Sequence, residues 1–183
     1  HEIALFELWV AERLLPEYQL VVIGSLLILV ALRARGSDLD HMVEYEVAYS
    51  QLCVSVLRTK TANSSTQRLP LYLIGPIVLI TSHECFASYV SLREELGIPL
   101  GEFPLFPAKV EGSWVPVKAL LADVNLVIRD GATRGGFKNP LSTSSHSAKP
   151  ALLQMSAEFG LSAEVRGALG YHKPKNASSS VES

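Results

Sequence analysis

The feature that most constrains the fold is an almost unbroken run of apolar residues over 20–32. A helix that is apolar nearly all round lies either at the centre of a protein or in a membrane. The run is only thirteen residues long, whereas a membrane-spanning helix needs roughly 20. It also contains Gly24 and Ser25, and two arginines follow it. The run therefore predicts a central buried helix, over 17–34, and no membrane span.

The remaining hydrophobic patterns predict further helices and one small sheet. Apolar residues at helical spacing predict helices over 3–15, 85–96, 117–129, 146–160 and 162–168. Segments rich in β-branched and aromatic residues predict three antiparallel strands, over 43–47, 51–58 and 67–74, with a hairpin near Lys60. Residues 101–114 and 134–145 are expected to be loops. This order of elements indicates an α+β fold that is mostly helical.

The composition limits the classes of function. Hydrophobic residues make up 48% of the chain and charged residues 19%, which is typical of a globular protein. Cys53 and Cys85 are too few for a disulfide framework, which favours a reducing compartment. No zinc or nucleotide motif is present, so we expect no metal and no cofactor. The net charge of −2 argues against a freestanding DNA-binding protein, although residues 133–183 hold six Lys or Arg against three Glu.

Two polar features in the first half of the chain are candidates for contact with a phosphate. Arg35 follows the central helix, and its planar guanidinium can form two parallel hydrogen bonds to a phosphate while Asp38 holds the local turn. Lys60 lies at the predicted hairpin. There an ammonium group can enter a DNA groove and protonate a departing 5′ oxygen as a general acid.

Two further candidates lie near the C-terminus of the sequence. His146 and Lys149 are three residues apart at a predicted helix start, so both project from one face. The histidine can exchange a proton with a nucleophile, the lysine can neutralise a nonbridging oxygen, and the helix N-terminus itself favours an anion. In the run Leu-Gly-Tyr-His that ends at His172, the glycine suits a left-handed helix cap. Tyr171 or His172 could then hydrogen-bond the phosphate.

Each feature alone also has an ordinary structural explanation. Arginines at 33 and 35 favour a helix C-terminus, and hairpin tips such as the one near Lys60 are exposed and often carry lysine. The polar turn at His146 and the cap before His172 are equally common surface features. On that interpretation the chain is a helical α+β interaction domain. Its Arg35, Lys60, His146 and Lys149 would then lie far apart.

The order and spacing of the four features resemble the tyrosine recombinase (phage integrase-like) family. The matched segments are Arg35-Gly36-Ser37-Asp38 for the first Arg box, Lys60 for the β-hairpin lysine, His146-Ser147-Ala148-Lys149 for the His-x-x-Arg box and Leu169-Gly170-Tyr171-His172 for the Leu-Gly-His box. The resemblance implies that residues 18–183 form a catalytic domain of this family's fold, with 1–17 the remnant of an N-terminal region or a linker helix. It also implies DNA strand cleavage through a 3′-phosphotyrosine, with no metal and no external energy source.

The chain departs from the family pattern at three places. Lys149 stands where the family has a second arginine, and an ammonium lacks the bidentate fork of a guanidinium. Tyr171 fills the usual His position of the third box and His172 comes one residue late, so either could face the site. The family's nucleophilic tyrosine follows this box, but no tyrosine follows Tyr171 here. Either the nucleophile comes after Ser183 or the gene has decayed.

These observations predict an enzyme that cleaves and rejoins DNA in site-specific recombination or integration. Its expected catalytic residues are Arg35, Lys60, His146, Lys149, His172 and Tyr171. The expected partners are double-stranded DNA and further copies of the chain, and no membrane. We expect an intracellular location, in the nucleus of a eukaryote or otherwise in the cytoplasm. Chain 1–183 itself is expected to be inactive. The alternative is a decayed mobile-element domain that binds DNA or a protein partner without catalysis.

Overall fold

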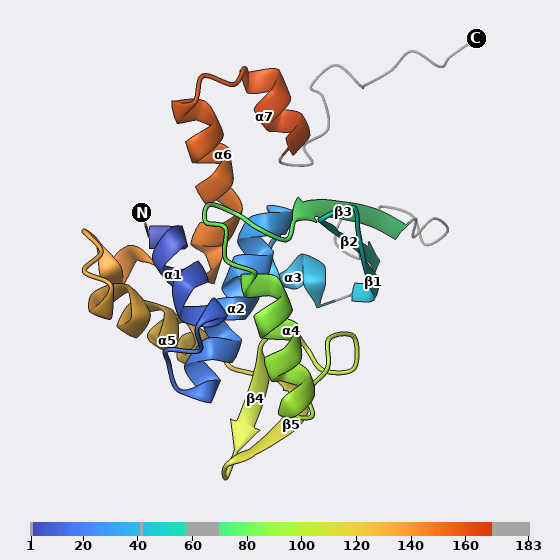
Figure 1. Cartoon of the computed structure of the whole chain (residues 1–183), viewed down its shortest axis with the longest axis vertical. Helices are drawn as coiled ribbons and strands as arrows, with labels where there is room; N and C mark the ends of the chain where they lie inside the picture. Colours follow the sequence, from blue (N-terminus) through green and yellow to red (C-terminus); the bar gives the residue numbers. More distant parts are fainter. Residues whose placement is uncertain (1, 41, 58–69, 170–183) are drawn as a thin grey trace.

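A computed structural model describes residues 2–40, 42–57 and 70–169 of the chain (Figure 1). It confirms the expected α+β class, mostly helical with a small antiparallel sheet. In chain order the elements are α1 (Glu2–Ala11), α2 (Glu17–Leu32), α3 (Gly36–Leu39), β1 (Met42–Ala48), β2 (Gln51–Leu57), β3 (Pro70–Pro76), α4 (Cys85–Glu95), β4 (Pro107–Val110), β5 (Ser113–Lys118), α5 (Leu121–Arg134), the 3-10 turns η1 (Pro140–Ser142) and η2 (Ser145–Ser147), α6 (Ala148–Glu158) and α7 (Ala163–Leu169).

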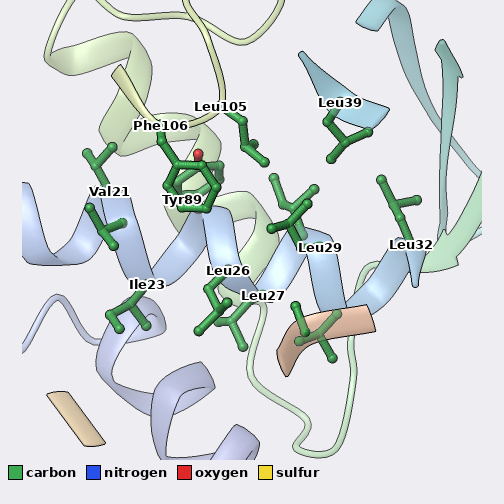
Figure 2. Packing of buried hydrophobic residues seen from close by; sticks show 14 of the residues in the cluster. Val21, Ile23, Leu26, Leu27, Leu29, Leu32, Leu39, Tyr89, Leu105 and Phe106 are labelled. Carbon is green, nitrogen blue, oxygen red and sulfur yellow. The ribbon is translucent and has the colours of Figure 1, made fainter. Parts of the chain in front are cut away.

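Helix α2 is the centre of the molecule, as its apolar sequence predicts. Every residue from Leu20 to Leu32 is buried. Helices α1, α4, α5 and α6 and strand β3 pack around α2, and Figure 2 shows its side chains projecting on several sides, with Tyr89 and Phe106 packed against one of them. Because every side of α2 has a neighbour, no polar stripe is needed on it. Among the described helices, none is long and apolar enough to cross a bilayer.

The predicted three-stranded antiparallel sheet is also confirmed. The strand order is β1-β2-β3, with β2 in the middle. Leu52, Val54, Val56 and Leu73 are buried on the side that joins the core, while Tyr72 and Ile74 of β3 are exposed. This alternation is what a sheet with one solvated face requires. Pairing of Leu57 with Pro70 joins the strands next to the segment 58–69, which lies outside the described residues.

A second antiparallel pair, β4 and β5, replaces the loop expected over 101–114. Its two turn residues, Glu111 and Gly112, have φ angles of 50° and 83°. Positive φ at both positions is the requirement of the tight hairpin turn that matches the twist of two strands. Strand β5 runs to Lys118, so α5 begins at Leu121 rather than at residue 117. Prolines in this segment obscured the strand pattern, but a two-stranded ladder has edge positions that tolerate them.

Glu7 is a charged residue buried inside the core, with no exposed surface. Its carboxylate accepts hydrogen bonds from the backbone N–H groups of Leu79, Ile80 and Thr81, at 2.8, 3.0 and 2.8 Å. These three bonds compensate for the loss of water and fix the loop before α4 against α1.

Burial, together with the nearby Glu7 charge, raises the pKa of the Cys85 thiol to about 12.

Arg93 of α4 is the second fully buried charge. Its guanidinium donates to the carbonyl oxygens of Ile98, Pro104 and Leu105, at 2.7, 3.1 and 3.0 Å, and to the Tyr89 hydroxyl at 2.8 Å. None of the ion pairs among the described residues involves Arg93. The positive charge is therefore held by neutral oxygens, which fold the 98–105 loop back onto α4.

Candidate functional site

Arg35 lies where the chain leaves the central helix. Helix α2 ends at Leu32, and Arg35 occupies the position just before α3 in an extended backbone conformation. Its backbone N–H donates to the Asp38 carboxylate at 3.0 Å, so Asp38 holds this turn as the sequence predicts. The Arg35 side chain is exposed, and within residues 2–40, 42–57 and 70–169 it forms no ion pair. Its guanidinium is therefore available to an external anion.

His146 lies in η2, immediately before α6. The turn is closed by Ser144 N–H, which donates to Ser147 Oγ at 3.2 Å. It is joined to α5 by Ser145 N–H, which donates to the Asn125 side chain at 3.0 Å. Ser145 is buried, whereas His146 is exposed. The backbone that carries the imidazole is thus fixed to the body of the protein while the ring faces solvent.

The helix that follows His146 begins two residues later than predicted. Residues 145–147 form a 3-10 turn, and α6 starts at Ala148. Ser147 does not cap α6, because its hydroxyl is already engaged with Ser144. Lys149 belongs to the first turn of α6, but its side chain is outside the part of the chain that the structure describes.

The remaining three predicted site residues are not placed. Lys60 falls in segment 58–69, and Tyr171 and His172 fall in segment 170–183, both outside the described residues. What the structure gives for Lys60 is the pair of antiparallel strands, β2 and β3, on either side of its segment. For Tyr171 and His172 it gives α7, which ends at Leu169 and packs against α6.

Helix α2 lies near both candidates that are placed. A cavity of about 90 Å³ between α1, α2 and α6 is lined by Leu26, Leu27 and Val30 of α2 and by Ser147 and Ala148 at the start of α6. The turn that carries His146 therefore lies beside the C-terminal half of α2. That half leads directly to α3, which Figure 1 shows next to it.

Arg33 has a role that the sequence did not indicate. It was expected only to favour the helix C-terminus, but its guanidinium Nη2 donates to the Ile74 carbonyl of β3 at 2.8 Å. Its backbone is left-handed, with a φ of 50°. That conformation is common for glycine and uncommon for arginine. The strained backbone and the bond to a distant strand together indicate that the Arg33 side chain has a structural purpose next to Arg35.

No grouping of His, Cys, Asp and Glu side chains within the described ranges is suited to hold a metal ion. Comparison of the chain with models of known protein families gave no match, and comparison with curated proteins gave none.

Proposed function

We propose that this chain contains the phosphate-binding part of a DNA strand-cleaving and rejoining site of the tyrosine recombinase type. A nucleophilic tyrosine hydroxyl would attack the scissile phosphodiester, form a 3′-phosphotyrosine and release a 5′ hydroxyl. The reverse attack by a 5′ hydroxyl would restore the DNA backbone and free the tyrosine. One phosphodiester bond replaces another at each step, so neither a metal nor an external energy source enters the balance.

Each candidate side chain has a role in this reaction. Arg35 would bind two phosphate oxygens through its planar fork, and Lys149 would neutralise a nonbridging oxygen as charge builds up. Lys60 would protonate the departing 5′ oxygen, and His146 would accept the proton of the nucleophile. Tyr171 or His172 would donate a further hydrogen bond. The expected location is the compartment that holds the DNA, and several copies would act together on it.

One structural observation supports the proposal most. Arg35 and His146, the two placed candidates, are both exposed, on segments 111 residues apart in the sequence. The backbone at Arg35 is held by Asp38 of α3, and the turn that carries His146 is held by Asn125 of α5 beside the cavity that α2 lines. An exposed polar side chain without an intramolecular ion pair, held on a fixed backbone, can contact an external phosphate at little cost in ordering. The family's order of boxes supplies the specific reaction.

Binding to DNA is the first test. Anisotropy of a labelled duplex would be measured with chain 1–183 at several salt concentrations. The logarithm of the binding constant falls linearly with the logarithm of the salt concentration, and each lost phosphate contact should make this slope less steep by about 0.9. We expect R35A to weaken binding and reduce the slope by about that amount, with H146A weakening it less.

The matched control for this test is R129A. Arg129 is an exposed arginine on α5 with no ion pair among the described residues. Its replacement removes the same charge at another surface, and it should change affinity little. If R129A and R35A lost the same amount of DNA affinity, the binding would depend only on the overall charge of the protein. That result would contradict a phosphate site at Arg35.

The alternative, a domain that binds DNA or a partner without cleavage, is favoured by Lys149 and Tyr171 at positions where the family has Arg and His. A suicide DNA substrate separates the two when it is incubated with the protein and analysed for a covalent adduct. An adduct lost on replacement of a single tyrosine supports the enzyme. Tight binding without an adduct supports the alternative.

A further inference from the structure

The exit of α2 has a backbone conformation that does not suit its residue. Arg33 has φ and ψ of 50° and 35°, and the chain closes the helix there with Arg33 N–H on Val30 O and Ala34 N–H on Leu29 O. Helices that end in this way usually place glycine at the left-handed position, because a Cβ is disfavoured there. An arginine at this position suggests that its side chain has a use that glycine could not supply.

The side chain reaches a different element of the fold. Arg33 Nη2 donates to the Ile74 carbonyl oxygen at 2.8 Å. The next residue of β3, Gly75, packs so closely on α2 that a Cβ there would lie 2.3 Å from the carbonyl oxygen of Ala31. Strand β3 thus runs directly against the last turn of α2, and Arg33 bonds the two together at that point.

This contact lies two residues before Arg35. Helix α2 is buried before Arg33, and Arg33 itself is bonded to β3. The backbone between Arg33 and Arg35 therefore has little conformational freedom. We propose that Arg33 is a positioning residue, which fixes Arg35 relative to β3 so that the Arg35 guanidinium meets the DNA phosphate in one orientation. The inference rests on the proposed function, because it assumes that Arg35 binds phosphate.

Replacement of Arg33 by glycine separates positioning from stability. R33G relieves the left-handed strain and removes the bond to Ile74, so the thermal midpoint should stay the same or rise while DNA affinity falls. R33K keeps a donor of one hydrogen bond and should restore part of the affinity. If Arg33 served stability alone, R33G would lower the thermal midpoint, and the loss of DNA affinity would follow the loss of folded protein.

Arg13 provides a matched control. It is also an arginine with positive φ, 52°, just beyond a helix end, and its guanidinium bonds Glu95 of α4 rather than the sheet. R13G therefore makes the same chemical change with the same relief of strain. Hydrogen exchange of the β3 amides should become faster in R33G and stay unchanged in R13G. Equal β3 exchange in both variants would overturn the positioning role.

A double-mutant comparison decides how Arg33 acts on DNA binding. If it acts through Arg35, R33G should lower affinity by most of the factor that R35A causes, and R33G/R35A should bind no more weakly than R35A. Additive losses would mean that Arg33 contacts DNA itself and would overturn the inference. If R35A leaves affinity unchanged, the proposed function fails first, and the exchange experiment still tests the contact to β3.

Discussion

Ionisable residues in this molecule occupy two contrasting settings. Glu7 and Arg93 are fully buried. The Glu7 carboxylate accepts from three backbone N–H groups, and the Arg93 guanidinium donates to three carbonyl oxygens and one hydroxyl. Arg35 and His146 are exposed, and neither takes part in an ion pair within the described parts of the chain. Burial of a charge requires compensating bonds, so the first pair is committed to the fold. The second pair is available to a ligand.

Replacement of Arg93 should cause the largest loss of stability. In R93M the carbonyls of Ile98 and Pro104 lose the guanidinium as their donor, and that of Leu105 keeps only Ser25 Oγ, so we expect a loss of about 3–5 kcal/mol in the free energy of unfolding. Urea titration followed by circular dichroism measures it. R129M, the same change at an exposed position, is the control and should be nearly neutral. A loss in R93M under about 1 kcal/mol would contradict the structural role.

Glu7 should give the next effect. In E7Q one acceptor oxygen becomes an NH₂ group that faces backbone donors, so about 1–3 kcal/mol of stability should be lost. Hydrogen exchange should also become faster at the amides of Leu79, Ile80 and Thr81. The exposed Glu2 of the same helix is the control, and E2Q should change neither observable. Unchanged exchange at the three amides in E7Q would rule out the carboxylate as their acceptor.

A smaller, pH-dependent effect should come from Glu95. Its hydrogen bonds to Arg13 and Ser91 lower its pKa from 4.5 to about 2. A lowered folded-state pKa gives stability that is present above 4.5 and is lost as the pH falls towards 2. E95Q should therefore melt slightly below the natural chain at pH 7, with the difference shrinking below pH 4.5. The contribution is modest because the pair is exposed. A difference that does not vary with pH would contradict this origin.

The smallest effects on stability belong to the candidate site. R35A and H146Q remove exposed groups, so each should change the free energy of unfolding by no more than about 0.5 kcal/mol. DNA affinity should fall in R35A all the same, and this separation of binding from stability is what distinguishes the two settings. If R35A were strongly destabilised, Arg35 would have a structural role like that of Glu7 and Arg93. The same urea titration measures it.

The sequence predicted the parts of the fold that depend on local pattern. The apolar run of α2 and the β-branched strands of the first sheet are such parts, and both are confirmed. The hairpin of β4 and β5 was missed, because its signal is the backbone conformation of Glu111 and Gly112 rather than an alternation of apolar residues.

The charged groups show why the rest could not be predicted. Glu7 and Arg93 look like surface residues of amphipathic helices, and their partners are backbone atoms of loops, which carry no side-chain signature. For the site, residue type and spacing named Arg35 and His146, and the structure adds their exposure and their fixed backbones. The placement of Lys60, Tyr171, His172 and the Lys149 side chain stays a prediction.

The bonds of Glu7 have a practical consequence for work with this protein. Helix α1 supplies Phe6 and Val10 to the core, and its carboxylate holds a loop that is more than seventy residues away in the sequence. An expression boundary drawn at Tyr18 would uncover apolar surface and remove the acceptor of three backbone N–H groups in the loop before α4. Whatever the ancestry of the first seventeen residues, truncations meant to yield a crystallisable domain should retain them.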